Sequence, residues 1–406
     1  SNAFEMLGNS SFILTAEVGG TKTMSITGES VRQITGFAEN DTITLKARLF
    51  DIPGNETVGN ESSTKLLIDE TPPSLVSVSY ESDFSDSSLA TVGNVITLTF
   101  ETDVEILTPT TTISNNSANI SNLGSNRWSG AYTMQESDED GVIPFQIGTL
   151  TDSRGNPTEC SSETTDGTQV TFDNTAPTLN PVSILSNNPS TEWAKVGDTV
   201  IVTFTAEELL SSQIGSIVNQ SAIISDLGNQ NYTAAYAMDD GDPEGNIIFE
   251  IIVTDSVGIE SSPIIETTDE SYVIFDRTLP TLSMVHIESN NDNNTVIAVG
   301  GNEVYLSFTP EEPLIMDSIV VTIAEQVTTL TELGGTYTAT LTISGNEPEG
   351  ILEFTIDFRD RAGNSGIQVM TTTDESYVNH DIYPPEIEST SISSSGTDTT
   401  WAKIGD

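Results

Sequence analysis

Acidic residues at recurring positions are the side chains of this 406-residue chain that could do chemistry. An aspartate opens a proline-containing phrase four times, in steps of 104, 103 and 105 residues: Asp69 in DETPPSLVSV, Asp173 in DNTAPTLNPVSI, Asp276 in DRTLPTLSMVHI and Asp381 in DIYPPEIESTSI. A period this constant indicates one structural unit copied in series. Carboxylate oxygens are ligands that calcium favours in proteins. Cation binding, repeated along the chain, is therefore the first chemistry to consider.

The overall charge is strongly negative and argues against some partners. The chain has 61 acidic residues, 12 basic residues and 2 histidines, for a net charge of −49. Such a surface repels nucleic acid and anionic membranes. It attracts cations, yet solubility or adaptation to a salty medium accounts for the charge equally well. The position of each acid has to decide between ion binding and solubility.

Cysteine and histidine are too scarce for two other kinds of site. The single cysteine, Cys160, cannot form a disulfide within the chain, and with two histidines it does not supply a Cys/His zinc site. No apolar run approaches the roughly 18 residues that a membrane-spanning helix needs. No signal peptide is visible, and Ser1–Ala3 resembles the scar left by removal of a purification tag.

The apolar residues alternate in short runs, which is typical of β-strands. Val95–Phe100, Val200–Phe204 and Val304–Phe308 alternate, are rich in β-branched residues and are bounded by turn-forming residues. No stretch has a sustained helical period. Several short strands in each repeat of ~100 residues predict an all-β chain of tandem β-sandwiches, which we expect to be arranged as an elongated rod.

Three phrases of the repeats carry a resemblance to a known family. VTFTAEE, DRAGN and DNTAPT, in that order within the repeat and at this spacing, resemble the bacterial immunoglobulin-like repeats of very large secreted or cell-surface adhesins. The resemblance covers essentially the whole chain. It implies immunoglobulin-like sandwiches in series, often stiffened by calcium in a cadherin-like organisation, and an extracellular location. Val257-Gly258-Ile259 departs from the D-x-x-G-N pattern, and Asn94 or Gly301 replaces the aspartate of V-G-D, so these positions are not expected to be strict ligands.

The repeats predict the boundaries of the units. We expect a tag scar at 1–3, a truncated unit at 4–70, complete units at 71–174, 175–277 and 278–382, and the first strand and loop of a further unit at 383–406. The unit at 4–70 is expected to lack its first strand, because Phe12–Glu17 resembles Val202–Glu207, which follows the first strand of a complete unit.

A sandwich traced up and down predicts where the acids lie. With strands named A to G in order, the B–C and F–G turns lie at the end where the chain comes in, and the A–B and E–F turns lie at the end where it leaves. Acids from two consecutive units and the phrase between them are therefore expected to meet at each joint. The expected sets are Asp69, Asp103 and Asp152 at the first joint, Asp138, Asp140, Asp173, Glu207 and Asp255 at the second, and Asp242, Glu244, Asp276, Glu311 and Asp360 at the third.

Two interpretations of these acids stand side by side. Carboxylates gathered at a joint would repel one another, and a bound calcium ion would remove the repulsion and tie two units together. Single aspartates in such phrases also form turns, because aspartate caps its own backbone and glycine accepts positive φ. Recurrence at positions that should meet in space favours Ca²⁺ at the joints.

The functional prediction is a non-catalytic extender region of an adhesin. Abundant carboxylates could suggest a hydrolase, but they recur in every unit, whereas a catalytic site is usually single. The alternative is a module that directly binds a surface glycan or a protein, which would show one unit with an unshared exposed aromatic residue or loop. Trp193 and Trp401 would form a sugar-stacking platform if they were exposed, but we expect them in the core. Neighbouring repeats are the expected partners. The segment 383–406 is further expected to supply a strand to the truncated unit of another copy, head to tail.

Overall fold

The computed structural model describes residues 32, 38–39, 42–44, 46–50, 53–395, 397 and 399–405. The chain divides into two compact units, Ser1–Thr175 and Ala176–Asp406, and each is described by itself. The predicted tag scar and the predicted strand at Phe12–Glu17 lie outside the described residues. Within the described ranges, no helix is both long enough and apolar enough to cross a membrane.

Among its described residues, the first repeat has four strands, all in the first unit. β1 (Thr42–Ile43) pairs with β4 (Leu66–Leu67), and β2 (Lys46–Phe50) pairs with β3 (Glu56–Glu61), both antiparallel. The chain then runs through Asp69 into a complete sandwich, called here the second sandwich, which lies wholly within the first unit.

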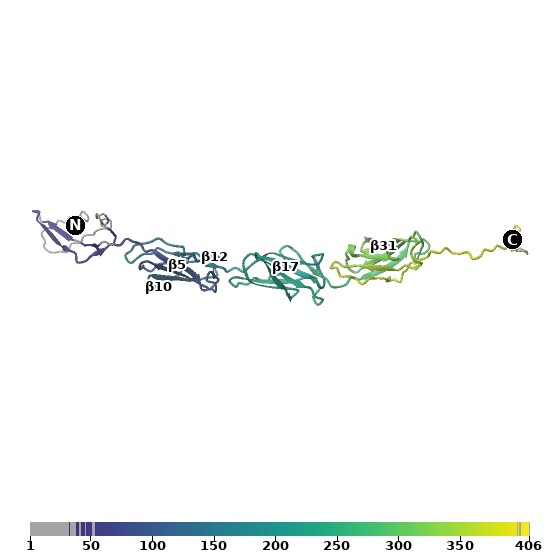
Figure 1. Ribbon diagram of the computed structural model, residues 1–406, viewed down its shortest axis with the longest axis horizontal. Coiled ribbons are helices and arrows are strands. Elements are labelled where there is room, and N and C mark those ends of the chain that lie inside the picture. Colours follow the sequence, from purple (N-terminus) through teal and green to yellow (C-terminus); the bar gives the residue numbers. More distant parts are fainter. Residues whose placement is uncertain are drawn as a thin grey trace. The chain divides into compact units, whose positions relative to one another are not determined.

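The second sandwich is built from one four-stranded sheet, in the order β10-β11-β7-β5, and two three-stranded sheets, β12-β14-β6 and β13-β8-β9 (Figure 1). Its strands are β5 (Leu75–Ser82), β6 (Leu89–Ala90), β7 (Val95–Thr102), β8 (Thr111–Ile113), β9 (Asn116–Ser117), β10 (Asn119–Gly124), β11 (Arg127–Thr133), β12 (Gly141–Val142), β13 (Phe145–Ile147) and β14 (Thr171–Phe172).

The second unit repeats this topology twice. The third sandwich has the sheets β15-β17-β21-β20, β16-β24-β22 and β19-β18-β23, and the fourth has β25-β27-β31-β30, β26-β34-β32 and β29-β28-β33. The strands of the third are β15 (Leu179–Ser186), β16 (Trp193–Ala194), β17 (Thr199–Ala206), β18 (Leu210–Ile217), β19 (Gln220–Ser221), β20 (Ile223–Gly228), β21 (Asn231–Ala237), β22 (Gly245–Asn246), β23 (Phe249–Asp255) and β24 (Ile274–Phe275).

The fourth sandwich completes the series. Its elements are β25 (Leu282–Ser289), β26 (Ile297–Ala298), β27 (Glu303–Pro310), the 3₁₀ turn η1 (Met316–Ser318), β28 (Val320–Ile323), β29 (Gln326–Val327), β30 (Thr329–Leu333), β31 (Thr336–Thr342), β32 (Gly350–Ile351), β33 (Phe354–Asp357) and β34 (Asn379–His380). Three sandwiches with one topology confirm the predicted all-β, tandem-sandwich fold.

Alternation of buried and less buried residues along the second long strand of each sandwich builds the core. In β7 and β17 every second residue is buried, because successive side chains of a strand point to opposite faces. Phe100, Phe204 and Phe308 occupy equivalent positions and are all 0% exposed. Each lies opposite an aromatic residue of the neighbouring strand, Trp128, Tyr232 or Tyr337. In the third and fourth sandwiches the tyrosine ring stacks on the ring of the core phenylalanine, which helps to fix the strands whose ends carry the acids.

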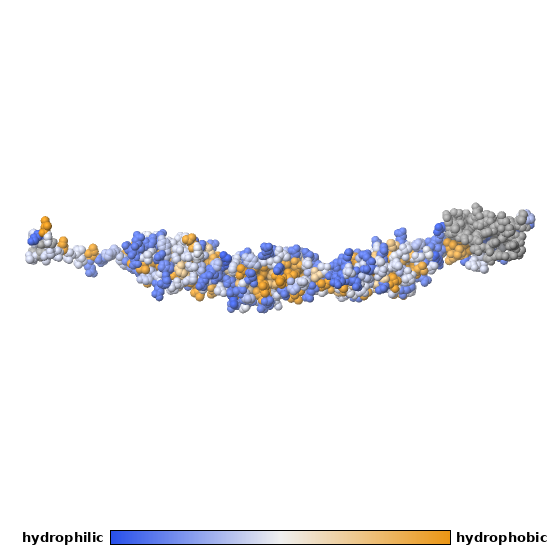
Figure 2. Space-filling view, turned by 180° about the vertical axis from the view of Figure 1, so that it is seen from behind, coloured by the Kyte–Doolittle hydropathy of each residue, from blue (hydrophilic) through white to orange (hydrophobic). Residues whose placement is uncertain are grey.

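The two recurring tryptophans do not behave alike. Trp193 is half-buried in β16, whereas Trp401 is 77% exposed, so the prediction that both fill a core is wrong for Trp401. Residues 384–394 form no strand, and Ile387 and Ile392 are exposed. The face shown in Figure 2 has many hydrophilic residues, in keeping with the many acids, and hydrophobic residues that gather mainly over the middle of the view.

Candidate metal centre

The aspartate of each repeated phrase forms a turn with the residue two positions later. One carboxylate oxygen, Oδ1, accepts the backbone N–H of that residue at 3.0–3.1 Å, in the pairs Asp69–Thr71, Asp173–Thr175, Asp276–Thr278 and Asp381–Tyr383. The turn interpretation of these aspartates is therefore correct. It uses only one carboxylate oxygen in each, so the same residue can also bind a cation.

Two acids lie in the turn just before β12, β22 or β32, called here the acidic turn: Asp138 and Asp140, Asp242 and Glu244, or Glu347 and Glu349. The second acid of each acidic turn holds the linker that follows. Glu244 accepts the backbone N–H of Arg277 at 3.0 Å and the hydroxyl of Thr278 at 2.7 Å, and this hydroxyl lowers the pKa of Glu244. Asp140 accepts in the same way from Asn174 and Thr175. Glu39 accepts from Glu70 and Thr71, and Glu349 accepts from Ile382. Asp140 and Glu244, both predicted as ligands, thus accept hydrogen bonds from the linker that carries the aspartate of the repeated phrase, Asp173 or Asp276.

The first acid of each acidic turn bonds back to its own turn. Asp138 accepts from Gln135 N, Ser114 Oγ and Asn116 Nδ2 at 2.8–3.2 Å. Asp242 accepts from Asp239 N at 2.7 Å and from the Tyr236 hydroxyl at 3.3 Å. Asp242 thus closes the loop in which it lies, and Asp138 also joins its turn to the β8–β9 hairpin through Ser114 and Asn116.

Glu347 is the equivalent turn acid in the fourth sandwich and is only 5% exposed. Its carboxylate accepts from Ser344 N, Ser344 Oγ, Gly345 N and Gln326 Nε2 at 2.8–3.1 Å. Burial alone would raise its pKa, but the hydrogen bonds from Ser344 and Gln326 outweigh burial and lower the pKa to about 2.

Replacing Glu347 by glutamine is expected to destabilise the fourth sandwich by about 1.5–3 kcal/mol at neutral pH, because hydrogen bonds to a charged acceptor are lost. The folded-state pKa of about 2 lies below the ordinary 4.5, so the contribution is full above pH 4.5 and is lost as the pH falls towards 2. Urea unfolding at a series of pH values measures this. The matched variant Glu353→Gln, at an exposed position, should change stability little at any pH.

The acids one residue after the second long strand of each sandwich (β7, β17 or β27) anchor the start of the first long strand (β5, β15 or β25). They are Asp103, Glu207 and Glu311, and they accept hydroxyl hydrogen bonds from Ser74, Thr178 and Thr281 at 2.6–2.8 Å. The next position in each repeat is Val104, Glu208 or Glu312. Sequence reasoning chose the first glutamate of each Glu-Glu pair, and the structure brings the second glutamate to the carboxylates of the joint.

A buried aspartate in the turn after the sixth long strand completes the arrangement. Asp152, Asp255 and Asp360 are 2%, 0% and 0% exposed. The segment after the second strand pairs with this turn through Ile106, Leu210 or Leu314, which brings the glutamate beside the aspartate. Strand pairing inside the sandwich therefore sets the glutamate–aspartate contact.

The buried aspartates differ in how their two oxygens are satisfied. Asp255 Oδ1 accepts three backbone N–H groups at 2.7–2.9 Å, and Asp360 Oδ1 accepts the N–H of Asn364 at 2.9 Å. The second oxygen, Oδ2, is buried and has no hydrogen-bond partner in either residue. A buried anionic oxygen without a partner is costly, so each points to a cation that the protein chain does not supply.

Within the second unit, Asp276, Glu312 and Asp360 form one cluster. Each offers an oxygen, and these oxygens all lie within 4.8 Å of one another. Calcium binds oxygen at about 2.3–2.6 Å, so two oxygens on one ion lie at most about 5 Å apart. Burial raises the pKa of Asp276, and the carboxylates of Asp360 and Glu244 raise it further. Burial and the same neighbours raise the pKa of Glu312. The cluster fits a divalent cation in spacing and in charge.

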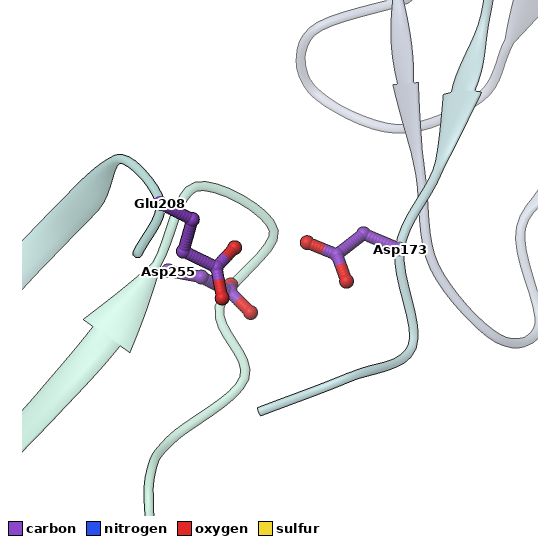
Figure 3. Close-up of side chains that lie close together, drawn as sticks. All are labelled: Asp173, Glu208 and Asp255. Atoms are coloured by element: carbon purple, nitrogen blue, oxygen red, sulfur yellow. The ribbon is translucent and has the colours of Figure 1, made fainter. Parts of the chain in front are cut away.

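The third sandwich carries the same glutamate–aspartate pair. Figure 3 shows the carboxylates of Glu208 and Asp255 side by side, with oxygens within 4.8 Å of each other. Glu208 follows β17, and Asp255 ends β23. Asp173, also labelled in Figure 3, follows β14 in the first unit and is the repeat equivalent of Asp276.

Direct hydrogen bonds also hold the turn that carries Asp360. Lys195 Nζ donates to the carbonyl of Gly363, and Asn188 Nδ2 donates to the carbonyl of Ala362, both at 2.9 Å. Asn364 Nδ2 donates to the backbone carbonyl of Asp276 at 2.9 Å. The turn is thus pinned to the third sandwich and to the linker, which keeps Asp360 next to Asp276.

The acids of the first joint have partners of their own. Asp69 Oδ2 lies 2.7 Å from Arg154 Nη1. Asp152 Oδ2 accepts from Asn156 Nδ2 at 3.0 Å, and Asp152 Oδ1 accepts the N–H groups of Arg154 and Asn156 at 2.8 and 2.9 Å. Burial would raise the pKa of Asp152, but the hydrogen bonds from Asn156 and Arg154 lower it on balance. The predicted first set, Asp69, Asp103 and Asp152, is therefore satisfied by the protein itself.

Comparisons place these sandwiches beside known proteins. No family model and no curated protein matches the chain. A solved structure from a 1.5-MDa bacterial ice-binding adhesin, described for host cell surface retention, matches at 14% identity over 78% of this chain and 100% of that chain, with a TM-score of 0.47. A Ca²⁺-stabilised adhesin with which an Antarctic bacterium binds ice matches at 14% identity over 84% and 82%, with a TM-score of 0.33. The fibronectin(III)-like modules of Clostridium thermocellum CbhA match at 14% identity over 51% and 100%, with a TM-score of 0.26.

Proposed function

We propose that this chain is a non-catalytic extender region of a secreted or cell-surface adhesin, and that calcium ties its later sandwiches together. The observation that carries the proposal is the buried, unpartnered Oδ2 of Asp360, in a cluster with Asp276 and Glu312. Turn formation accounts for the other oxygen of Asp360 and leaves this one unexplained.

Three carboxylates would hold the ion at the third joint. Asp276 comes from the linker, whereas Glu312 and Asp360 come from the fourth sandwich, so one ion would join the linker to the sandwich that follows. Calcium accepts six to eight oxygens at flexible geometry, and backbone carbonyls and water would complete its shell. Bound there, the ion supplies positive charge to carboxylates that otherwise repel one another.

The repeat extends the proposal to the second joint. Asp173 is the equivalent of Asp276, and Glu208 and Asp255 are the equivalents of Glu312 and Asp360. Asp255 Oδ2 is buried without a partner, as Asp360 Oδ2 is. We therefore assign Glu208 and Asp255 to a second calcium site of the same kind.

A role outside the cell fits this type of site. Extracellular calcium modules bind with dissociation constants of about 10⁻⁴–10⁻³ M, which suits surroundings where calcium is abundant. The many acids on the surface keep such a chain soluble and suppress non-specific association. In this role the sandwiches separate a distal binding module from the cell, and the ions restrict bending at the joints.

The test is small-angle X-ray scattering of the whole chain in calcium and in chelator. The calcium concentration is about 2 mM, which lies just above the dissociation constants of extracellular calcium modules. We expect a larger maximum dimension and a narrower distribution of distances in calcium. Magnesium at the same concentration is the control, because it demands near-ideal octahedral geometry and keeps its water, so it should reproduce little of the effect. Identical profiles in calcium and chelator would contradict the proposal.

A further inference from the structure

We infer that the guanidinium of Arg154 occupies, at the first joint, the place that calcium takes at the later joints, so that the first joint holds together without the ion. The inference rests on the proposed function of the later joints. Two substitutions at equivalent positions, and the contacts around them, carry it.

The first substitution removes a ligand. Glu208 and Glu312 lie four residues after the buried phenylalanines Phe204 and Phe308. The same count from Phe100 reaches Val104. The first joint therefore lacks one of the three carboxylates that form the cluster in the fourth sandwich.

The second substitution adds a cation. Two residues after the buried aspartates Asp255 and Asp360 the chain has Val257 and Ala362, whereas two residues after Asp152 it has Arg154. A glutamate is thus lost and an arginine gained in one sandwich. At these equivalent positions the third joint has three carboxylates, and the first joint has two carboxylates and a guanidinium.

The contacts show the arginine on the central aspartate. Arg154 Nη1 lies 2.7 Å from Asp69 Oδ2, and the side chain of Asp69 is only 14% exposed. Exposed ion pairs contribute little, but a short contact to a largely buried carboxylate is a charge-assisted hydrogen bond. Asp69 Oδ1 caps the linker at Thr71 N. Both oxygens of Asp69 are thereby engaged within the chain.

The buried aspartate of the first joint is satisfied as well. Asn156 Nδ2 donates to Asp152 Oδ2 and to the backbone carbonyl of Asp69, both at 3.0 Å. In the fourth sandwich the equivalent amide, Asn364 Nδ2, donates to the carbonyl of Asp276, while Asp360 Oδ2 keeps no partner. The third sandwich has Ile259 at this position and no amide to offer. The unpartnered oxygen is found where Arg154 is absent.

The inference predicts how many ions the chain binds. Equilibrium dialysis of the full chain against calcium should give two bound ions, one for each glutamate–aspartate pair. The double variant Val104→Glu/Arg154→Ala restores the carboxylate and removes the guanidinium, and it should bind three. Two ions in both proteins, or three in the unchanged chain, would overturn the inference while leaving the proposed function intact. No bound calcium in the unchanged chain would instead refute the proposed function, and this inference with it.

A reciprocal variant keeps the test valid if the double variant fails to fold. Glu312→Val/Ala362→Arg transfers the arrangement of the first joint to the third joint. It should bind one ion instead of two, and the unfolding temperature of its fourth sandwich should no longer change between calcium and chelator. A calcium-dependent unfolding temperature in this variant, with two ions still bound, would count against the inference.

Discussion

Replacing Asp360 by asparagine is expected to stabilise the fourth sandwich in chelator and to abolish the further stabilisation that calcium gives to it. Asparagine keeps an oxygen for the N–H of Asn364 and removes the buried charge from beside Asp276 and Glu312. Without the ion, relief of a buried unpartnered oxygen is worth about 1–3 kcal/mol. With the ion, a ligand is lost, and with it the stabilisation that calcium gives, which is about 1.4 kcal/mol at 10 times the Kd.

Urea unfolding in calcium and in chelator measures the change in the free energy of unfolding in each buffer. Asp152→Asn is the matched control, because Asp152 has partners for both oxygens in the first joint. Its replacement puts an amide N–H₂ group opposite that of Asn156 and should destabilise the second sandwich equally in both buffers. If calcium stabilises the Asp360→Asn variant as much as it stabilises the unchanged chain, Asp360 is not a calcium ligand.

Truncating the core phenylalanines should reveal which sandwich supports which ion. Phe308→Ala removes a fully buried ring stacked on Tyr337 at 5.4 Å between ring centroids. Loss of a buried phenylalanine costs about 3–5 kcal/mol, a large share of the roughly 5–15 kcal/mol that stabilises a domain. Glu312 and Asp360 both lie in the fourth sandwich, so calcium affinity at the third joint should fall with it.

Phe204→Ala makes the comparison asymmetric. The third sandwich carries Glu208 and Asp255, and its last strand leads into Asp276. Its loosening should weaken both calcium sites, whereas Phe308→Ala should weaken one. Calcium titrations at a urea concentration below the transition of the unchanged chain measure this. Equal losses in the two variants would mean that the ions are not held where the repeat places them.

Much of this arrangement follows from the sequence alone. The period located Asp276, and the Asp-x-x-Gly phrase located Asp360, because both features depend on local residue order. Glu312 was missed although alternation carried a signal: residues 304, 306 and 308 are buried, and the same parity extended past the end of β27 at Pro310 selects residue 312 rather than residue 311. Parity counted from the core phenylalanine would have selected the second glutamate of the pair.

The remaining differences depend on contacts that residue order does not specify. Asp138 and Asp242 lie at the ends of their sandwiches where the topology predicted acids, but short side chains reach their own turn more readily than a neighbour. Arg154 escaped notice because its effect depends on a coincident change at Val104, which lies 50 residues earlier in the chain. Such paired changes become meaningful only once the fold brings the two positions to one joint.

The short parallel strand pairs give the sandwiches a property that neither charge nor burial describes. In each sandwich a two-residue strand soon after the first long strand pairs with the last strand in parallel, as β16 does with β24 and β26 does with β34. The chain leaves immediately after that last strand, at Asp276 or Asp381. Tension drawn between the two ends of a sandwich therefore loads these hydrogen bonds side by side, in shear. They must break together rather than peel apart one at a time, so resistance to pulling depends on the rate of forced unfolding more than on equilibrium stability.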